Sequence, residues 1–148
     1  ESKENKKIDY RVNSSDKTFR TLLAEDNLVN QKVAVKILQK LNCAVDIAAN
    51  GEEALQMVRQ SPYDLIFMDC HMPVMDGYQA TTEIRKYLMG VDKHIPIIAM
   101  TANAIKGDRE KCIATGMDDY LSKPIDQKKL RDIIEKWSNE TNIKDIAV

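Results

Sequence analysis

The 148-residue chain is poor in the features that mark several specialised classes of protein. Its three cysteines, Cys43, Cys70 and Cys112, show no C-x-x-C spacing and cannot all pair within one chain, so we expect reduced thiols rather than a disulfide framework. No apolar run approaches the roughly 18 residues that a membrane span requires, and no secretory leader is visible. The net charge of −1 provides no field that would gather nucleic acid or an anionic membrane. We therefore expect a soluble, cytoplasmic domain that contacts neither nucleic acid nor membrane.

The rest of the composition is that of an ordinary globular domain. With 43% hydrophobic and 30% charged residues, a chain of this length can bury a core and form one domain. Residues 1–17 are polar and lack a sustained period, so we expect a linker over 1–17, a folded domain over 18–138 and a frayed tail over 139–148. The chain begins with Glu1 rather than methionine, and we expect it to be part of a longer polypeptide.

Five apolar segments of strand length alternate with five segments of helical periodicity. Strands are expected at 21–24, 44–48, 64–68, 95–100 and 119–121, and helices at 28–41, 51–60, 77–88, 103–116 and 126–137. Short strands linked by helices require a parallel sheet with right-handed crossovers. The pattern predicts an α/β fold, a flavodoxin-like (βα)5 three-layer sandwich with strand order 2-1-3-4-5, although periodicity alone does not fix that order.

One of the predicted helices is weakly anchored. Between residues 103 and 116 only Ile105, Cys112 and Ile113 offer bulky apolar surface, and Gly107 lies near the start. A helix with so few buried apolar contacts opens at low cost. We therefore expect this helix to move more readily than the other four.

Asp69 follows the most apolar of the predicted strands. The run from Leu65 to Met68 is typical of a central strand that is covered on both faces. We expect Asp69 to be the first residue beyond that strand, at the carboxyl end where open α/β sheets bind ligands. An aspartate that merely caps the next helix is the alternative. A soft-metal site at Cys70 and His71 is disfavoured, because two adjacent residues need further ligands to hold zinc.

Polar side chains also follow the other predicted strands. Glu25 and Asp26 come after the first strand, Thr101 after the fourth and Lys123 near the end of the fifth. In the predicted strand order these side chains converge with Asp69 on one shallow pocket. Three carboxylates so close repel one another unless a cation is bound, and Mg²⁺ is the hard divalent ion that best suits oxygen ligands here. Acids, a hard metal, a lysine and a hydroxyl together suit phosphoryl transfer to a carboxylate, with Asp69 as the nucleophile.

Four motifs give the chain a family resemblance. They are Leu23-Ala-Glu-Asp-Asn27, Met68-Asp-Cys-His-Met-Pro73 with Met75-Asp-Gly77, Met100-Thr-Ala102, and Gly116-Met-Asp-Asp-Tyr-Leu-Ser-Lys-Pro124. From about Thr18 to Trp137 the chain resembles the receiver domains of response regulators in two-component and phosphorelay signalling. The resemblance implies a domain that catalyses its own phosphorylation and dephosphorylation on an aspartate.

The resemblance implies a role for each residue at the strand ends, with Asp69 as the phosphoacceptor. The implied ligands of Mg²⁺ are the carboxylates of Asp26 and Asp69, a water held by Glu25, and the backbone carbonyl of His71. The implied partners of the phosphoryl oxygens are the Thr101 hydroxyl, the Ala102 amide and the Lys123 ammonium. The peptide bond between Lys123 and Pro124 is implied to be cis.

The resemblance also implies a switch. Phosphorylation would draw the Thr101 hydroxyl toward the new anion, and Tyr120 would turn inward to fill the vacated space, which changes the surface around the last two helices and the last strand. His71 and Asn103 occupy positions that line the path of the hydrolytic water, so we expect them to tune the lifetime of the phosphoryl group. The alternatives are a half-buried core tyrosine for Tyr120 and a loop residue that offers only its backbone for His71.

Three other functions fit parts of the sequence. An aspartyl phosphatase of the haloacid dehalogenase type would place a second acid two residues after the nucleophile, where this chain has His71. A flavin or nucleotide module would need a phosphate-binding loop after the first strand, where Glu25 and Asp26 would repel phosphate. A degenerate receiver that serves only as an interaction module is disfavoured by the intact set of acids, threonine and lysine.

The segments Asp69–Tyr78 and Ala102–Ile105 resemble the receivers of hybrid sensor histidine kinases in particular. The implied phosphodonor is a phosphohistidine of a histidine kinase domain in the same polypeptide or its dimer mate. The implied acceptor is a histidine phosphotransfer domain. The parent chain would then be a histidine kinase anchored to a membrane outside this domain, and a free-standing single-domain regulator is the alternative.

Overall fold

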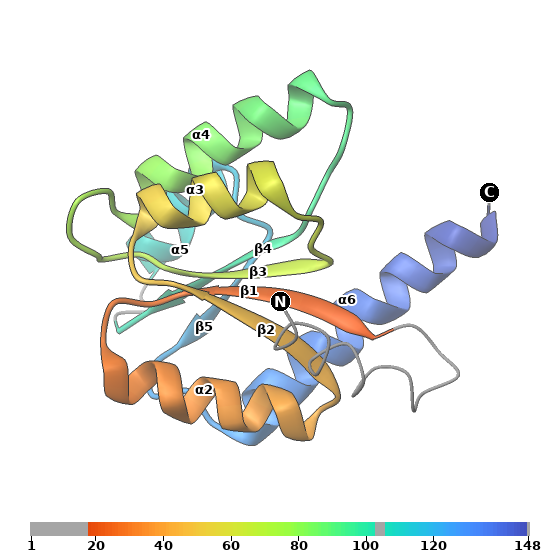
Figure 1. The fold of residues 1–148 in the computed structure, drawn as a ribbon, viewed down its shortest axis with the longest axis horizontal. Coiled ribbons are helices and arrows are strands. Elements are labelled where there is room, and N and C mark those ends of the chain that lie inside the picture. Colours follow the sequence, from red (N-terminus) through yellow and green to blue (C-terminus); the bar gives the residue numbers. More distant parts are fainter. Residues whose placement is uncertain (1–17, 103–105, 148) are drawn as a thin grey trace, which may run out of the picture.

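The computed structural model describes residues 18–102 and 106–147, which form three layers (Figure 1). The strands are β1 Phe19–Ala24, β2 Cys43–Ala48, β3 Leu65–Asp69, β4 Ile97–Thr101 and β5 Asp119–Ser122. The helices are α2 Leu28–Lys40, α3 Gly51–Gln60, α4 Gly77–Gly90, α5 Lys106–Thr115 and α6 Gln127–Ala147. The strands form one parallel sheet in the order β2-β1-β3-β4-β5. The predicted flavodoxin-like fold and its strand order are confirmed.

Two hydrophobic cores lie on opposite faces of the sheet. Helices α3, α4 and α5 cover one face, and α2 and α6 cover the other (Figure 1). Along β3, Ile66 and Met68 belong to the first core, whereas Leu65 and Phe67 belong to the second, because successive side chains of a strand point to opposite faces. All four side chains are fully buried. Burial on both faces fixes β3 in the middle of the sheet and thereby fixes the position of its carboxyl end.

Three strands, β3, β4 and β5, extend further at their carboxyl ends than predicted, and Thr101 belongs to β4 rather than following it. β3 includes Asp69, which pairs with Met100 of β4, and β5 includes Ser122, which pairs with Thr101. The prediction that Asp69 is the first residue beyond its strand is therefore wrong. The cause is the neighbouring strand, because the amide of Cys70 still donates to the carbonyl of Met100 at 3.0 Å. Asp69 is thus held by the sheet itself rather than by a loop.

The last helix also extends beyond its predicted end. α6 runs to Ala147 instead of ending at Trp137, and no proline or glycine lies between these residues to stop it. The backbone of residues 139–147, expected to be a frayed tail, is therefore helical. The expected linker over 1–17 lies outside the described residues. Among the described residues, no helix combines the length and the apolar character needed to cross a bilayer.

Helix α5 has a single deeply buried apolar side chain among its described residues. Cys112 is 1% exposed, whereas Ile113 is 56% exposed. Of the three apolar residues named in the sequence analysis, Ile113 does not contribute to the core, because consecutive residues lie about 100° apart around a helix and Ile113 faces solvent. Ile105 lies outside the described residues, as does the predicted start of the helix at residue 103. The small apolar contact of α5 keeps it a candidate for movement.

Candidate functional site

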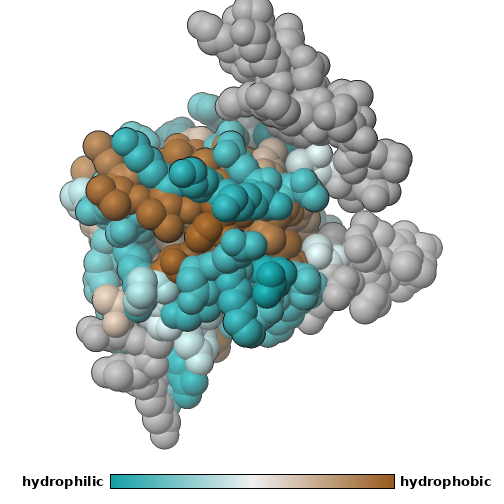
Figure 2. All heavy atoms as spheres, turned by 90° about the horizontal axis from the view of Figure 1, so that it is seen from below, coloured by the Kyte–Doolittle hydropathy of each residue, from teal (hydrophilic) through white to brown (hydrophobic). Residues whose placement is uncertain are grey.

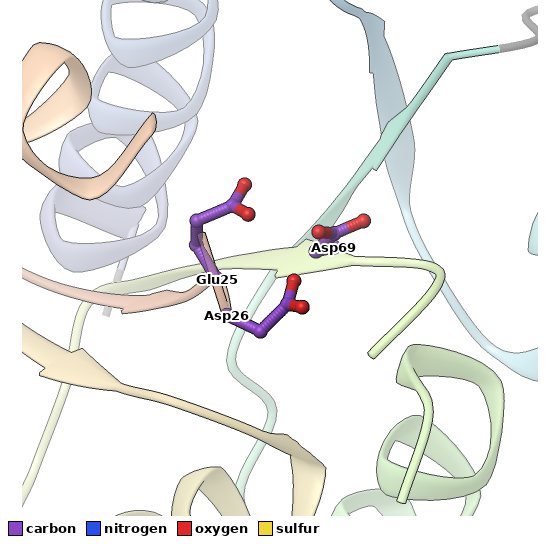
Figure 3. A group of neighbouring side chains, drawn as sticks. All are labelled: Glu25, Asp26 and Asp69. Carbon is purple, nitrogen blue, oxygen red and sulfur yellow. The ribbon is translucent and has the colours of Figure 1, made fainter. Parts of the chain in front are cut away.

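Three carboxylates converge at the carboxyl ends of two adjacent strands. Glu25 and Asp26 follow the last residue of β1, and Asp69 ends β3 (Figure 3). One carboxylate oxygen from each residue lies within 4.8 Å of the other two. Glu25 and Asp69 are buried, whereas Asp26 is exposed, so the cluster is open to solvent on the side of Asp26. The predicted convergence of these three side chains is observed.

Hydrogen bonds fix the two buried acids. The Glu25 carbonyl accepts from the Gln31 side-chain amide at 2.7 Å, and its carboxylate accepts from the Asn27 amide at 3.1 Å. The Asp69 carboxylate accepts from the His71 amide at 3.2 Å. The Asn27 and His71 amides hold the two carboxylates, and the Gln31 amide holds the backbone of Glu25 at the strand end.

The ammonium group of Lys123 lies between the two buried acids. Its Nζ is 3.0 Å from Asp69 Oδ2 and 3.2 Å from Glu25 Oε1. Burial lowers the pKa of Lys123, but the hydrogen bonds and negative charges of Asp69 and Glu25 outweigh burial and raise the pKa overall. The peptide bond between Lys123 and Pro124 is cis. Lys123 therefore lies within the acidic cluster as a cation, as the sequence predicted.

Thr101 lies on the other side of Asp69, at the end of β4. Its side chain is 1% exposed, and its carbonyl accepts from the Lys123 amide at 2.8 Å. The Thr101 hydroxyl donates to Asp108 Oδ2 of α5 at 3.5 Å, a long contact. Ala102 follows and is exposed. Asn103 lies outside the described residues.

Tyr120 is half-buried and faces α5. Its hydroxyl accepts from Arg109 Nη1 at 2.5 Å, and the guanidinium carbon lies 5.3 Å from the centre of the ring. A cation over an aromatic face adds a modest attraction to this hydrogen bond. Arg109 therefore holds the Tyr120 hydroxyl at α5, while the ring packs against the first hydrophobic core.

The loop after Asp69 begins with two residues in different environments. Cys70 is buried with its Sγ 4.0 Å from the Sγ of Cys112, and burial raises the pKa of Cys70 to about 12. His71 is exposed, and its ring meets the ring of Tyr78 edge-on at 6.1 Å between centroids. The two side chains do not converge on a common point. Among the described residues, Glu25, Asp26 and Asp69 form the only group of three potential metal ligands.

The helix that follows this loop has its own capping residue. Asp76 accepts from the Gln79 amide at 2.8 Å, and the Gln79 side chain accepts from the Asp76 amide at 3.3 Å, which is a capping box. The alternative that Asp69 merely caps this helix is therefore wrong. Gly77 donates to the Cys70 carbonyl at 3.0 Å, and a Cβ at this position would collide with the carbonyl oxygen of Asp69.

Three residues around the site were missed in the sequence analysis. Gln31 holds the Glu25 backbone, Arg109 holds Tyr120, and Lys129 contacts the segment that carries Lys123. Each of them lies on the face of a helix toward a strand end, and local sequence does not reveal that orientation. A polar residue at an otherwise inward helical position is the sequence feature that could have revealed Gln31, which is 9% exposed.

Comparisons with known proteins agree with this geometry. Residues 21–135 match the family model of the response regulator receiver domain. Hybrid signal transduction histidine kinase G of Dictyostelium discoideum is 42% identical over 132 residues, which covers 88% of this chain and 4% of that protein. The chain spans no more than 17% of the length of the first curated relatives that it matches.

Two solved structures are similar in both fold and sequence. The receiver domain of a sensor histidine kinase from Pseudomonas aeruginosa, which holds a magnesium ion in its active-site cleft, is 46% identical with a TM-score of 0.74. The match covers 81% of this chain and 97% of that one. The receiver domain of a Saccharomyces cerevisiae response regulator, solved with the histidine phosphotransfer protein Ypd1, is 31% identical with a TM-score of 0.75. That match covers 81% of this chain and 88% of the other.

Proposed function

The chain belongs to the response regulator receiver domain family of two-component and phosphorelay signalling, and we propose that it accepts a phosphoryl group on Asp69 from a phosphohistidine. The observation that carries the proposal is the contact of the Lys123 ammonium with Asp69 and Glu25, beside the exposed carboxylate of Asp26. A carboxylate nucleophile, a cation and oxygen ligands for a metal thus lie together at one edge of the sheet.

In the proposed reaction an Asp69 carboxylate oxygen attacks phosphorus, and the bond between phosphorus and the histidine nitrogen breaks. The imidazole leaves with the electron pair and takes up a proton, and Asp69 becomes an acyl phosphate. The Lys123 ammonium lies 3.0 Å from Asp69 and can offset the negative charge on the phosphoryl oxygens. The Thr101 hydroxyl and the Ala102 amide would hold the other oxygens.

The donor set of the acidic cluster fits Mg²⁺. Carboxylates are the oxygen ligands that this ion prefers, and three of them lie within 4.8 Å of one another. We propose that Asp26 and Asp69 bind Mg²⁺ with their carboxylates, Glu25 through a water, and His71 with its backbone carbonyl. When bound, the ion supplies positive charge that offsets the repulsion between the attacking carboxylate and the phosphoryl group.

We propose that Thr101 and Tyr120 form the switch that reports phosphorylation. The Thr101 hydroxyl contacts Asp108 and the Tyr120 hydroxyl contacts Arg109, so each of these two hydroxyl groups contacts a residue of α5. Movement of Thr101 toward a phosphoryl group would break its contact with Asp108. It would also favour a conformation of Tyr120 in which the contact with Arg109 is lost. Because α5 has little buried apolar surface, it can follow this change at low cost.

An apolar rim of exposed side chains beside the site supports the proposal that a protein partner binds there. Leu28 and Val29 begin α2 directly after the acidic loop and are 68% and 67% exposed, Val33 is 45% exposed, and Val74 in the loop after β3 is 82% exposed. Figure 2 shows apolar side chains bordered by polar ones on the side of the molecule that carries α2. Because α2 begins soon after Asp26 and Val74 follows soon after Asp69, a donor bound at Asp69 would lie near these side chains. We propose that a histidine phosphotransfer domain packs on it, as exposed apolar patches commonly mark interfaces.

We propose that the parent protein is a hybrid histidine kinase, with the kinase domain as phosphodonor and the phosphotransfer domain as acceptor. The similarity to hybrid kinases such as that of Dictyostelium discoideum supports this organisation. We also propose that the domain lies in the cytoplasm. Its three cysteines are free and buried, which suits a reducing compartment.

A phosphoramidate donor tests the proposed chemistry, because its bond between phosphorus and nitrogen mimics that of phosphohistidine. We expect the chain with Mg²⁺ and phosphoramidate to gain one phosphoryl group. Reduction by borohydride converts an aspartyl phosphate into homoserine, and peptide mass spectrometry should then find homoserine at residue 69. Homoserine at Asp26 or another acid would contradict the assignment of Asp69.

A further inference from the structure

Lys129 contacts the segment that carries Lys123 with all the donors of its ammonium group. Its Nζ lies 3.1 Å from the carbonyl oxygen of Ser122, 3.3 Å from the hydroxyl of Ser122 and 3.1 Å from the carbonyl oxygen of Pro124. An ammonium group has three donors, so these three oxygens saturate it. The contacts lie immediately before and after Lys123 in the chain, and together they bracket it.

The location of Lys129 in its helix indicates that these contacts determine where its ammonium group lies. Lys129 lies in the first turn of α6, where its amide donates to the capping side chain of Asp126 at 2.8 Å. A positive charge near a helix N-terminus is unfavourable with respect to the helix dipole. Unlike the ammonium of Lys128, which pairs with Asp132, the ammonium of Lys129 donates to oxygens of uncharged groups. Its half-buried ammonium is therefore directed to the strand end rather than to a surface ion pair.

Residues 122–124 connect Lys123 with Thr101, the two residues that the proposed reaction requires beside Asp69. Ser122 is the register partner of Thr101, and the Lys123 amide donates to the Thr101 carbonyl at 2.8 Å. The side chain of Lys123 must then reach Asp69 at 3.0 Å across the sheet edge. A small displacement of this backbone would lengthen that contact, and misplaced charged groups stabilise a transition state poorly.

We propose that Lys129 is a positioning residue for Lys123, with its ammonium clamping residues 122–124 so that the Lys123 ammonium stays on Asp69. The inference rests on the proposed phosphorylation of Asp69. Lys129 acts through the backbone of the clamped segment and makes its contacts there, whereas Lys123 contacts the reacting carboxylate. We therefore expect the clamp to affect the rate of phosphoryl transfer rather than the binding of the metal, whose proposed ligands lie at the end of β3 and in the loops that follow β1 and β3.

Three variants test this clamp. Lys129→Met removes the donors and the charge, Lys129→Arg retains both, and Lys128→Met removes the same charge from the neighbouring residue, whose side chain is 76% exposed. Each is incubated with Mg²⁺ and increasing acetyl phosphate, and the phosphoryl adduct is followed by intact mass. We expect K129M to lower the maximal rate roughly 3- to 10-fold, and K129R and K128M to stay within about twofold of the unaltered protein.

The Mg²⁺ dissociation constant, measured by calorimetry on the same proteins, separates positioning from a general loss of structure. We expect K129M to bind Mg²⁺ at least as tightly as the unaltered protein, since Glu25, Asp26 and Asp69 are held by other elements and a displaced Lys123 no longer competes with the ion. A K129M rate equal to that of K128M would overturn the inference, as would a parallel loss of rate and Mg²⁺ affinity. Absence of the adduct in the unaltered protein would instead contradict the proposed function itself.

Discussion

The ammonium group of Lys123 lies 3.0 Å from the carboxylate of Asp69 and so links the segment after β5 to the end of β3. It also contacts Glu25, which means that one cation offsets two buried carboxylates. Without this cation the three acids repel one another more strongly and gain more from a metal ion. We expect Lys123→Met to show a larger Mg²⁺-induced rise in melting temperature than the unaltered protein. An equal or smaller rise would mean that Lys123 and Mg²⁺ do not share these carboxylates.

His71 and Asn103 provide a test of how long the phosphoryl group persists. The exposed ring of His71 lies beside the site, edge-on to Tyr78, so its removal alters the approach of water without removing a charge from the acidic cluster. We expect His71→Ala and Asn103→Ala each to change the rate of dephosphorylation by roughly threefold or more while labelling is retained. The decay of the adduct is followed by intact mass after the donor is removed. Loss of all labelling in H71A would show that His71 is needed for the transfer itself.

Gly77 is required by a close approach of two backbone segments. A Cβ at this position would collide with the Asp69 carbonyl and lie 2.9 Å from the Cα of Cys70. Because backbone rather than a flexible side chain must move, we expect Gly77→Ala to lower the free energy of unfolding by about 1–3 kcal/mol or more. Gly107→Ala in α5 is the matched control, since nothing lies within 4 Å of its Cβ. Denaturant unfolding of both variants tests this, and a G77A protein as stable as G107A would contradict it.

The buried thiol of Cys43 makes the free energy of unfolding depend on pH in the alkaline range. Burial, assisted by the negative charge of Asp64, raises its pKa from 9.0 to about 12 in the folded protein. The unfolded chain loses this proton near pH 9 while the folded chain keeps it, so the contribution to stability is present below pH 9 and is lost between pH 9 and about 12. One such group contributes a slope of about 1.4 kcal/mol per pH unit in that window.

The matching measurement compares the unaltered protein with Cys43→Ala by urea unfolding at pH 8, 9 and 10. We expect C43A to be less stable at pH 8, because the variant leaves a small cavity. Its stability should then fall less between pH 9 and 10 than that of the unaltered protein. Equal slopes would show that the Cys43 thiol ionises normally in the folded state.

Much of this structure could be predicted from the sequence because the relevant information is local. Alternating apolar segments indicate strands and helices, and a parallel sheet then brings the ends of its strands to one edge. Glu25, Asp26, Asp69, Thr101 and Lys123 were all identified in this way, since each lies directly at or after a strand. Their proximity follows from the topology and needs no knowledge of individual contacts.

The features that were missed depend on partners distant in the chain. Asp69 belongs to β3 because β4 continues to pair with it, and the sequence around Asp69 does not contain that partner. Ile113 faces solvent although it is more apolar than its neighbour Cys112, because packing decides which of two adjacent residues faces the core. The contact of Lys129 depends on the turn of the backbone before α6, and lysine at a helix start ordinarily indicates a solvated side chain.

Intact mass after incubation with acetyl phosphate and Mg²⁺ tests the central claim most directly. The account predicts a single phosphoryl adduct that hydroxylamine removes, and that is absent both in Asp69→Asn and after Mg²⁺ is chelated. The D69N protein must retain its cooperative unfolding, so that loss of the adduct reflects the missing carboxylate. A stable adduct in D69N, or the same labelling with and without the metal, would contradict phosphorylation of Asp69 in a Mg²⁺-dependent site.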